Sequence, residues 1–224
     1  GSKEIILLGQ NVNAYSFEGL RLSNLILEIE KISGLDRIRY TTSHPKDMTD
    51  DLIEVYKNSK KLMPLVHLPV QSGSNKVLKL MNRKHTIKAY LKIFNKLKEI
   101  NPNIHFSSDF IIAYPGEDEN DFKDTLKLIE KVKFINSFSF IFSPRPGTLA
   151  SYLPTMHKKD SLKRLEIVQE ILFNNQKKMN KSLENTIQNV LVENRTDDKT
   201  NLFGKSEHMT SVFFNGSDDL IGKI

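Results

Sequence analysis

The 224-residue sequence predicts an α/β fold, in which a mainly parallel sheet built from repeated βα units is followed by a small all-β module. Short apolar runs alternate with segments whose apolar residues recur every three or four positions, which is the pattern of strands alternating with amphipathic helices. The loops between them are rich in Gly, Ser, Asn and Pro. After about residue 186 the helical pattern stops, and only brief apolar pieces remain between turn residues.

Five apolar runs are predicted to form the parallel strands. Residues 37–42 alternate between two faces, and Ser43-His44-Pro45 ends that strand. Because each run is followed by a helical segment, neighbouring strands are expected to run parallel and to form a partial, TIM-like (β/α) barrel. The five predicted strands are residues 5–8, 37–42, 65–70, 104–113 and 137–142.

Helical periodicity follows each predicted strand. Residues 22–32 carry Leu and Ile at spacings of three and four, and Gly34 is the expected stop. A long helix is expected from residue 158 to about residue 185. The other expected helices are residues 47–59, a segment starting at Asn75, residues 87–97 and residues 122–129.

The end of the chain is predicted to be all-β. Apolar pieces occur at residues 190–192, 202–203, 212–214 and 220–221. A module of fewer than about 40 residues rarely has a sufficient core of its own, so we expect it to dock on the larger part or to be cut short. The expected division is a barrel over residues 1–157, a connecting helix over 158–185 and the module over 186–224.

Composition and charge narrow the class of protein. With 38% hydrophobic and 27% charged residues, the chain can bury a core and is not a disordered or collagen-like protein. No apolar run approaches the roughly 20 residues of a membrane-spanning helix, so we expect a cytoplasmic protein without a membrane partner. The net charge is +6, and all of the positive excess falls in residues 1–185. This excess permits a polyanionic partner there.

Several kinds of catalytic site are excluded by the residues present. The chain has no cysteine, so its own thiols cannot form disulfides, act as nucleophiles or hold an iron–sulfur cluster. The six histidines show no metal-ligand spacing, and His67 and His105 are interpreted as strand residues. The glycine motifs of nucleotide hydrolases, dinucleotide-binding proteins and ester hydrolases do not occur. No metal ligand and no catalytic residue is therefore assigned.

Five loops fall at the carboxyl ends of the predicted strands, where parallel α/β proteins bind their ligands. Their Gly, Ser, Asn and Gln residues can hydrogen-bond a polar ligand, and the alternative is that they only serve turn geometry. The loops are residues 9–13, 41–44, 71–74, 113–117 and 143–147.

Single residues in these loops carry two interpretations each. Ser74 can contact a ligand or cap the next helix, and both can hold together. Residues 118–121 precede a helix, which favours local capping over acid–base chemistry, whereas Glu117 at the strand end stays a functional candidate. Arg83 and Arg145 can pair with a carboxylate or a phosphate, and an exposed structural arginine is the alternative.

Six sequence blocks follow one another along the chain: LLGQNVNAY at 7–15, YTTSHP at 40–45, HLPVQSGS at 67–74, MNRKHT at 81–86, DFIIAYPGE at 109–117 and FSPRPGT at 142–148. In this order they resemble those of the radical-SAM methylthiotransferases. The resemblance covers nearly the whole chain and implies strands two to six of a six-stranded partial radical-SAM barrel, with one sheet edge open. It also implies that residues 186–224 are a truncated TRAM-like module that holds tRNA. Ala113 stands where the family has glycine.

The resemblance also implies an activity. Members use S-adenosylmethionine, two 4Fe-4S clusters and an electron donor, and the forms of residues 10–13 and 83–86 favour the branch that adds a methylthio group to C2 of isopentenyl-adenosine beside the tRNA anticodon. The sequence begins after the family's cluster-binding cysteines, so this chain ligates neither cluster and is expected to be inactive alone. The expected cofactor contacts are Gln10, Asn11, Gln71, Ser72, Ser74, Arg83 and the backbone from Ile111 to Gly116.

Two alternative functions stay open. Sister enzymes act on threonylcarbamoyl-adenosine in tRNA or on a ribosomal protein. A module that binds RNA without a cluster, through its basic surface, is the alternative from another class. A hydrolytic or aldol-type barrel lacks a nucleophile or metal set in this sequence.

Overall fold

The computed structural model describes residues 1–224 and contains the predicted parallel sheet. Strand β1 (Glu4–Leu7) pairs in parallel with β4 (Arg37–Tyr40), β5 (Leu65–His67) with β6 (His105–Ser107), and β7 (Asp109–Ile112) with β8 (Phe138–Ile141). Parallel bridges from Ile38 to Leu62 and from Gln71 to Phe110 join these pairs. The predicted α/β fold with a mainly parallel sheet is therefore confirmed.

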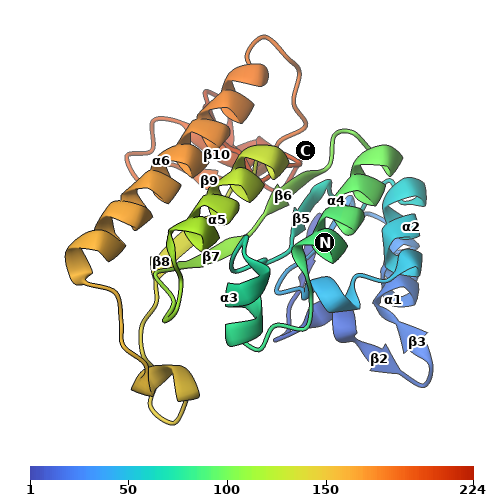
Figure 1. The fold of residues 1–224 in the computed structure, drawn as a ribbon. Coiled ribbons are helices and arrows are strands. Elements are labelled where there is room, and N and C mark those ends of the chain that lie inside the picture. Colours follow the sequence, from blue (N-terminus) through green and yellow to red (C-terminus); the bar gives the residue numbers. More distant parts are fainter.

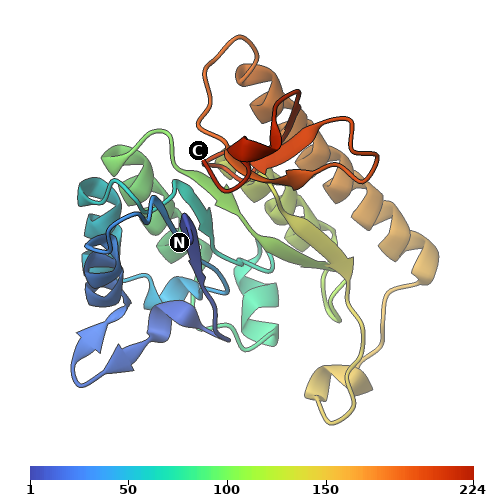
Figure 2. The same cartoon turned by 180° about the vertical axis from the view of Figure 1, so that it is seen from behind.

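Helices cover one face of this sheet. In Figure 1, α1 (Leu22–Glu30), α2 (Asp50–Asn58), α3 (Asn75–Leu80), α4 (Ile87–Ile100) and α5 (Glu119–Val132) lie in front of the strands. Figure 2 shows the opposite face of the sheet, with the C-terminal module at its upper end. None of the helices is both long and apolar enough to cross a membrane.

Side chains alternate along the strands between the helical face and the opposite face. Ile38, Val66, Phe106 and Phe110 are almost completely buried in the core that the helices share with the sheet. Their neighbours Arg39, His67, Ser107 and Asp109 instead line a cavity. The sheet therefore presents a polar set of side chains away from the helices.

The longest predicted strand, residues 104–113, is divided. Ser108 is buried and separates β6 from β7, because its hydroxyl accepts the Val70 N–H and its own N–H donates to Ser137 Oγ, both at 2.9 Å. Two other elements differ from expectation. The helix predicted over 47–59 begins at Asp50 after a 3-10 turn, and an unpredicted hairpin joins β2 (Ser16–Phe17) to β3 (Leu20–Arg21).

The C-terminal module is a three-stranded antiparallel sheet of β9 (Leu191–Arg195), β10 (Leu202–Lys205) and β11 (Ser211–Phe214). The fourth apolar piece, residues 220–221, is not a strand: Asp218–Leu220 forms a 3-10 turn, and the following Gly222 and Lys223 hydrogen-bond the backbone of Val192 in β9. The predicted long helix is α6 (Lys158–Ser182), which leads into the module. The domain boundaries and the TRAM likeness stay predictions.

The module docks on the amino ends of the barrel strands. Asn136 Nδ2 donates to the His208 carbonyl at 2.9 Å, and the His208 ring lies 2.8 Å from the Asn103 carbonyl. Arg37 and Arg39, both buried, donate to module carbonyls. The expectation that so small a module would dock is met by these contacts.

Candidate functional site

The carboxyl-end loops, here called the rim, lie next to one another. Asn13 joins the first two, since its Nδ2 donates to the His44 carbonyl at 2.9 Å and its Oδ1 accepts the His44 N–H at 2.8 Å. Gln71 N–H donates to the Asp109 carbonyl at 3.0 Å and links the third loop to β7. The rings of Tyr114 and Phe142 meet edge to face at 4.9 Å and connect the last two loops.

The fifth loop lies furthest from the others. The connection from residue 143 to residue 157, which includes the 3-10 turn Leu149–Tyr152, extends away from the barrel at the bottom of Figure 1. Arg145 is exposed, as are Leu149 and Tyr152. The structure thus gathers four of the five predicted loops around one opening and leaves most of the fifth outside it.

The first loop carries two predicted cofactor contacts. Gln10 is exposed and its side chain has no hydrogen bond within the chain. Asn11 Nδ2 donates to Asp47 Oδ2 at 2.7 Å, which fixes the amide, while its Oδ1 is shielded from solvent and has no partner. A buried acceptor without a donor is uncommon, so Asn11 can take a hydrogen bond from a ligand.

The third loop is held mainly by α5. The Ser74 hydroxyl donates to Asp121 Oδ1 at 2.6 Å and accepts the Val77 N–H at 3.3 Å, so its capping role is confirmed. Ser72, almost fully buried, lies 3.4 Å from the Thr125 hydroxyl. Both side chains are therefore used inside the protein, and their cofactor roles stay predictions.

Two glycines determine the backbone path of the third and fourth loops. A Cβ on Gly73 would lie 2.4 Å from the Thr125 Cα, so only glycine permits this approach to α5. Gly116 has a φ of +88°, which a turn of this kind requires. Gln71 has a φ of +73° without being glycine, and the Ile111 N–H already donates to its carbonyl at 2.9 Å. Ile111 cannot therefore offer that N–H to a cofactor.

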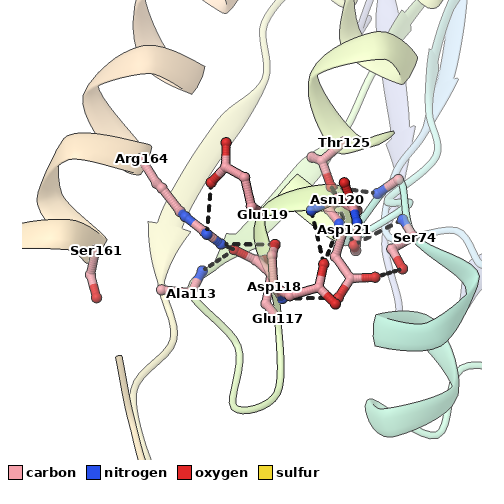
Figure 3. Close-up of polar contacts among 12 residues, drawn as sticks. Ser74, Ala113, Glu117, Asp118, Glu119, Asn120, Asp121, Thr125, Ser161 and Arg164 are labelled. Carbon is pink, nitrogen blue, oxygen red and sulfur yellow. Dashed lines mark hydrogen bonds and ion pairs between the residues drawn. The ribbon is translucent and has the colours of Figure 1, made fainter. Parts of the chain in front are cut away.

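The fourth loop is tied to α6 through an ion pair (Figure 3). Arg164 Nη1 lies 2.6 Å from Glu117 Oε1, which also accepts the Ala113 N–H. Burial raises the pKa of Glu117 and Arg164 opposes that rise. Asp118 and Asp121 accept each other's backbone N–H at the start of α5, which confirms their predicted capping role. Glu117 thus anchors a helix, and its position gives it no opening to the cavity.

A cationic and aromatic group follows α3. Arg83 is half-buried and has no carboxylate within ion-pair distance, although Asp109 is near enough to oppose the lowering of its pKa by burial. The buried His85 ring meets the His44 ring edge to face at 5.4 Å, and neither nitrogen of His85 has a hydrogen-bond partner. Burial, followed by His44, lowers the pKa of His85 to about 4. An arginine without a partner is a ready site for a carboxylate.

A cavity of about 1100 Å³ lies on the face of the sheet opposite α1 to α5. In its centre His67 Nδ1 is 2.9 Å from the Ser107 hydroxyl, and His67 Nε2 is 3.7 Å from Asp109 Oδ2. Burial lowers the pKa of His67, and Asp109 opposes that shift. The cavity therefore contains a connected polar cluster of three side chains, His67, Ser107 and Asp109.

None of the predicted cofactor contacts lines this cavity. His67 was correctly placed on a strand but was not recognised as a site residue, and Asp109 was quoted only within a motif. Alternation along the strands is the signal that could have found them. Every second residue of a barrel strand faces inward, and His67, Ser107 and Asp109 take such positions in β5 to β7, beside the apolar Leu65.

A family model described as the radical SAM superfamily matches residues 1–129. The chain belongs to the radical SAM superfamily. This assignment agrees with the parallel partial barrel and with a rim that collects polar groups at the carboxyl ends of the strands.

The most similar relatives share one name. The tRNA-2-methylthio-N(6)-dimethylallyladenosine synthase of Pelagibacter ubique is 68% identical over 100% of this chain and 51% of its own length. The synthase of Anaplasma phagocytophilum is 46% identical over 100% of this chain and 52% of its own length. The chain thus spans about half the length of the curated relatives it matches. Among solved structures, the cobalamin-dependent S-adenosylmethionine radical enzyme OxsB covers 97% of this chain, and the chain covers 32% of OxsB, at 10% identity and a TM-score of 0.48, too low to add to the assignment.

The polar groups of the rim and its neighbourhood fit S-adenosylmethionine. Arg83 without an acidic partner suits the carboxylate, and the free Asn11 Oδ1 suits a donor group of the cofactor. An iron–sulfur cluster does not fit the residues of this chain. There is no cysteine, and no three His, Asp or Glu side chains are grouped as metal ligands.

Proposed function

We propose that this chain forms the cofactor- and substrate-binding barrel of a tRNA-2-methylthio-N(6)-dimethylallyladenosine synthase. The observation that carries the proposal is the 68% identity to the Pelagibacter ubique protein of that name over the whole chain. Seven further relatives, 46–48% identical, bear the same name, which favours this substrate over those of the sister enzymes.

The rim residues would hold S-adenosylmethionine, which supplies radical chemistry for abstracting a hydrogen atom when it is bound. Arg83 would bind the carboxylate in a charge-assisted pair, and the Asn11 and Gln10 amides would hydrogen-bond its polar groups. Gln71 of the third loop stays a proposed contact. Ser72 and Ser74 would act through the loop they hold against α5, and the turn at Gly116 keeps the fourth loop in place.

The amino end of the cavity is closed by the module. Met209 lines the cavity, and Arg39 donates to the carbonyls of Ser206 and Glu207 at 3.1 and 2.8 Å. We expect a substrate to enter from the rim, away from the module. The barrel would thus orient its ligands, while the cofactor carries the chemistry.

The proposed partners follow from the reaction. The substrate is the anticodon stem-loop of a tRNA, and the positive excess in residues 1–185 would attract its phosphates. An electron donor would also be required. Such a substrate places the protein in the cytoplasm.

A chimera tests the proposal. Residues 1–224 replace the matching half of the Pelagibacter ubique synthase, and the chimera is expressed in a bacterium that lacks its own synthase. Mass spectrometry of digested tRNA should detect 2-methylthio-N6-dimethylallyladenosine. Activity on unsubstituted or threonylcarbamoylated adenosine instead, or no methylthio product from a folded chimera, contradicts the proposal.

A further inference from the structure

One side of the cavity is an aromatic wall, formed by β8 with its preceding turn and by one face of α6. Its large apolar side chains are Phe138, Phe140, Leu172 and Phe173. The α6 residues that line the cavity, at positions 169, 172, 173 and 176, are separated by three and four positions, so they lie on one face of the helix. The remaining wall residues are the neutral Asn136, Ser137, Ser139, Gln169 and Gln176.

The aromatic wall exposes unusually large apolar side chains. Phe138, Phe140 and Phe173 are 61%, 56% and 67% exposed, and the rings of Phe138 and Phe140 stack with their centroids 6.4 Å apart. Three phenylalanines grouped in this way along a cavity indicate a binding surface, because scattered single residues are the usual form of apolar exposure.

The strands next to the aromatic wall differ from it in chemistry, and Asp109 of β7 is the register partner of Phe138 of β8. The polar cluster of His67, Ser107 and Asp109 offers donors and acceptors, and the only fully charged side chains that line the cavity are Arg39 and Asp109. No charged side chain lies on the aromatic wall. A ligand of this cavity should therefore have one edge that hydrogen-bonds and one group that is uncharged and apolar.

We propose that the aromatic wall receives the N6-dimethylallyl group of the substrate adenosine, while the polar cluster faces the hydrogen-bonding edge of the base. This inference rests on the proposed function and names the residues that select the substrate. The dimethylallyl group is a five-carbon hydrocarbon, which gains from burial against phenylalanine rings. Asp109 and His67 can accept from and donate to the nitrogens of an adenine.

The charge of the wall also excludes the sister substrate. A threonylcarbamoyl group carries a carboxylate, and burying it on a wall that contains no cation would leave that charge without a counter-charge. The wall therefore favours the hydrocarbon substituent on physical grounds.

Binding of two anticodon stem-loop RNAs to the 224-residue chain tests the inference. The RNAs differ only in bearing adenosine or N6-dimethylallyladenosine at the target position, and fluorescence anisotropy gives both dissociation constants. The wild-type chain should bind the dimethylallyl RNA about tenfold more tightly. Phe140→Ala should reduce this preference to about threefold or less. Phe17→Ala, which removes an equally exposed ring on the β2–β3 hairpin, should leave it unchanged.

Three results would overturn the inference. The first is equal affinity of the wild-type chain for the two RNAs, and the second is an unchanged preference in Phe138→Ala, Phe140→Ala and Phe173→Ala. The third is an equal loss of affinity for both RNAs in these variants, which would mean that the rings stack on the base itself. Circular dichroism verifies that each variant is folded. If the chimera produces the methylthio nucleoside while the preference does not depend on the wall, this inference fails and the proposed function stands.

Discussion

The arginines at the two ends of the barrel differ in their hydrogen-bond and ion-pair partners. At the amino end, Arg37 donates to the carbonyls of Lys205 and Asn189 at 2.9 and 2.8 Å, and Arg39 pairs with Glu4 at 2.9 Å besides its two module carbonyls. At the carboxyl end, Arg83 is half-buried without an ion-pair partner. The same side chain thus fastens the module at one end and stays available at the other.

This difference separates structural from ligand-binding charges. A buried guanidinium must find acceptors. At the amino end, where the two arginines only stabilise the fold, the chain itself supplies these acceptors. At the carboxyl end, the Arg83 guanidinium, the buried Asn11 amide oxygen and the buried His85 imidazole all lack partners, and a ligand is expected to supply them. We therefore expect substitutions at the amino end to change stability and those at the rim to change binding.

Arg39→Ala should have the largest effect on stability. Removing this guanidinium leaves the half-buried Glu4 carboxylate and two carbonyls without their donor, so we expect the free energy of unfolding to fall by about 3 kcal/mol. Urea unfolding followed by circular dichroism measures it. Arg21→Ala is the control, because its ion pair to Asp51 is exposed and should contribute less than about 1 kcal/mol. Equal losses in both variants would break the comparison.

His85 should make stability depend on pH. Its pKa of about 4 in the folded protein lies below the value of about 6.5 in the unfolded chain. The folded state therefore binds fewer protons between these pH values, and the free energy of unfolding should rise with pH across that window. We expect about 1 to 2 kcal/mol from this residue after allowing for solvent screening.

The His85→Gln variant isolates this contribution. The pKa of His105 at the amino end is also lowered to about 4, so the variant should lose part of the pH dependence and keep the rest. Urea unfolding at pH 4.5 and pH 7 compares the variant with the wild type. An identical pH dependence in both would show that the unpaired ring is not desolvated as the structure indicates.

Ala113→Gly should have the smallest effect. Ala113 has a φ of +57°, where glycine is relieved of a strain of roughly 1 kcal/mol, and glycine loses a similar amount through the greater freedom of the unfolded chain. The Ala113 methyl group is buried in the core, so the loss of its contacts should lower the free energy of unfolding by about 1 kcal/mol or less. Thermal unfolding measures it, and a loss above about 2 kcal/mol would mean that the core does not tolerate the space left by the methyl group.

The sequence predicted the strands and helices of the barrel because their periodicity is local. Residues 22–32 and 87–97 are helical in the structure almost to the predicted ends. It did not predict the division of β6 from β7, since the bonds of Ser108 come from Val70 and Ser137, which are distant in the sequence. The β2–β3 hairpin was missed because its turn is Glu18-Gly19 rather than Asn-Gly or Asp-Gly.

The candidate site was predicted only in part for the same reason. Motifs identify loops, so Asn11 and Arg83 could be proposed as contacts and stay predictions, whereas Ser74 is bonded to Asp121 of α5, a partner that no local pattern reveals. The cavity residues His67 and Asp109 required knowing which face of each strand turns away from the helices. That face is decided by packing over the whole barrel.

The affinity of the chimera for S-adenosylmethionine tests most directly whether the rim is a binding site. Equilibrium dialysis under anaerobic conditions compares Arg83→Gln with Lys84→Gln, an exposed neighbour whose ammonium bonds only to Asn82. We expect Arg83→Gln to weaken binding about 10- to 100-fold with unchanged stability, because a charge-assisted bond to the carboxylate is lost. Unchanged affinity in Arg83→Gln, or an equal loss in Lys84→Gln, would contradict it.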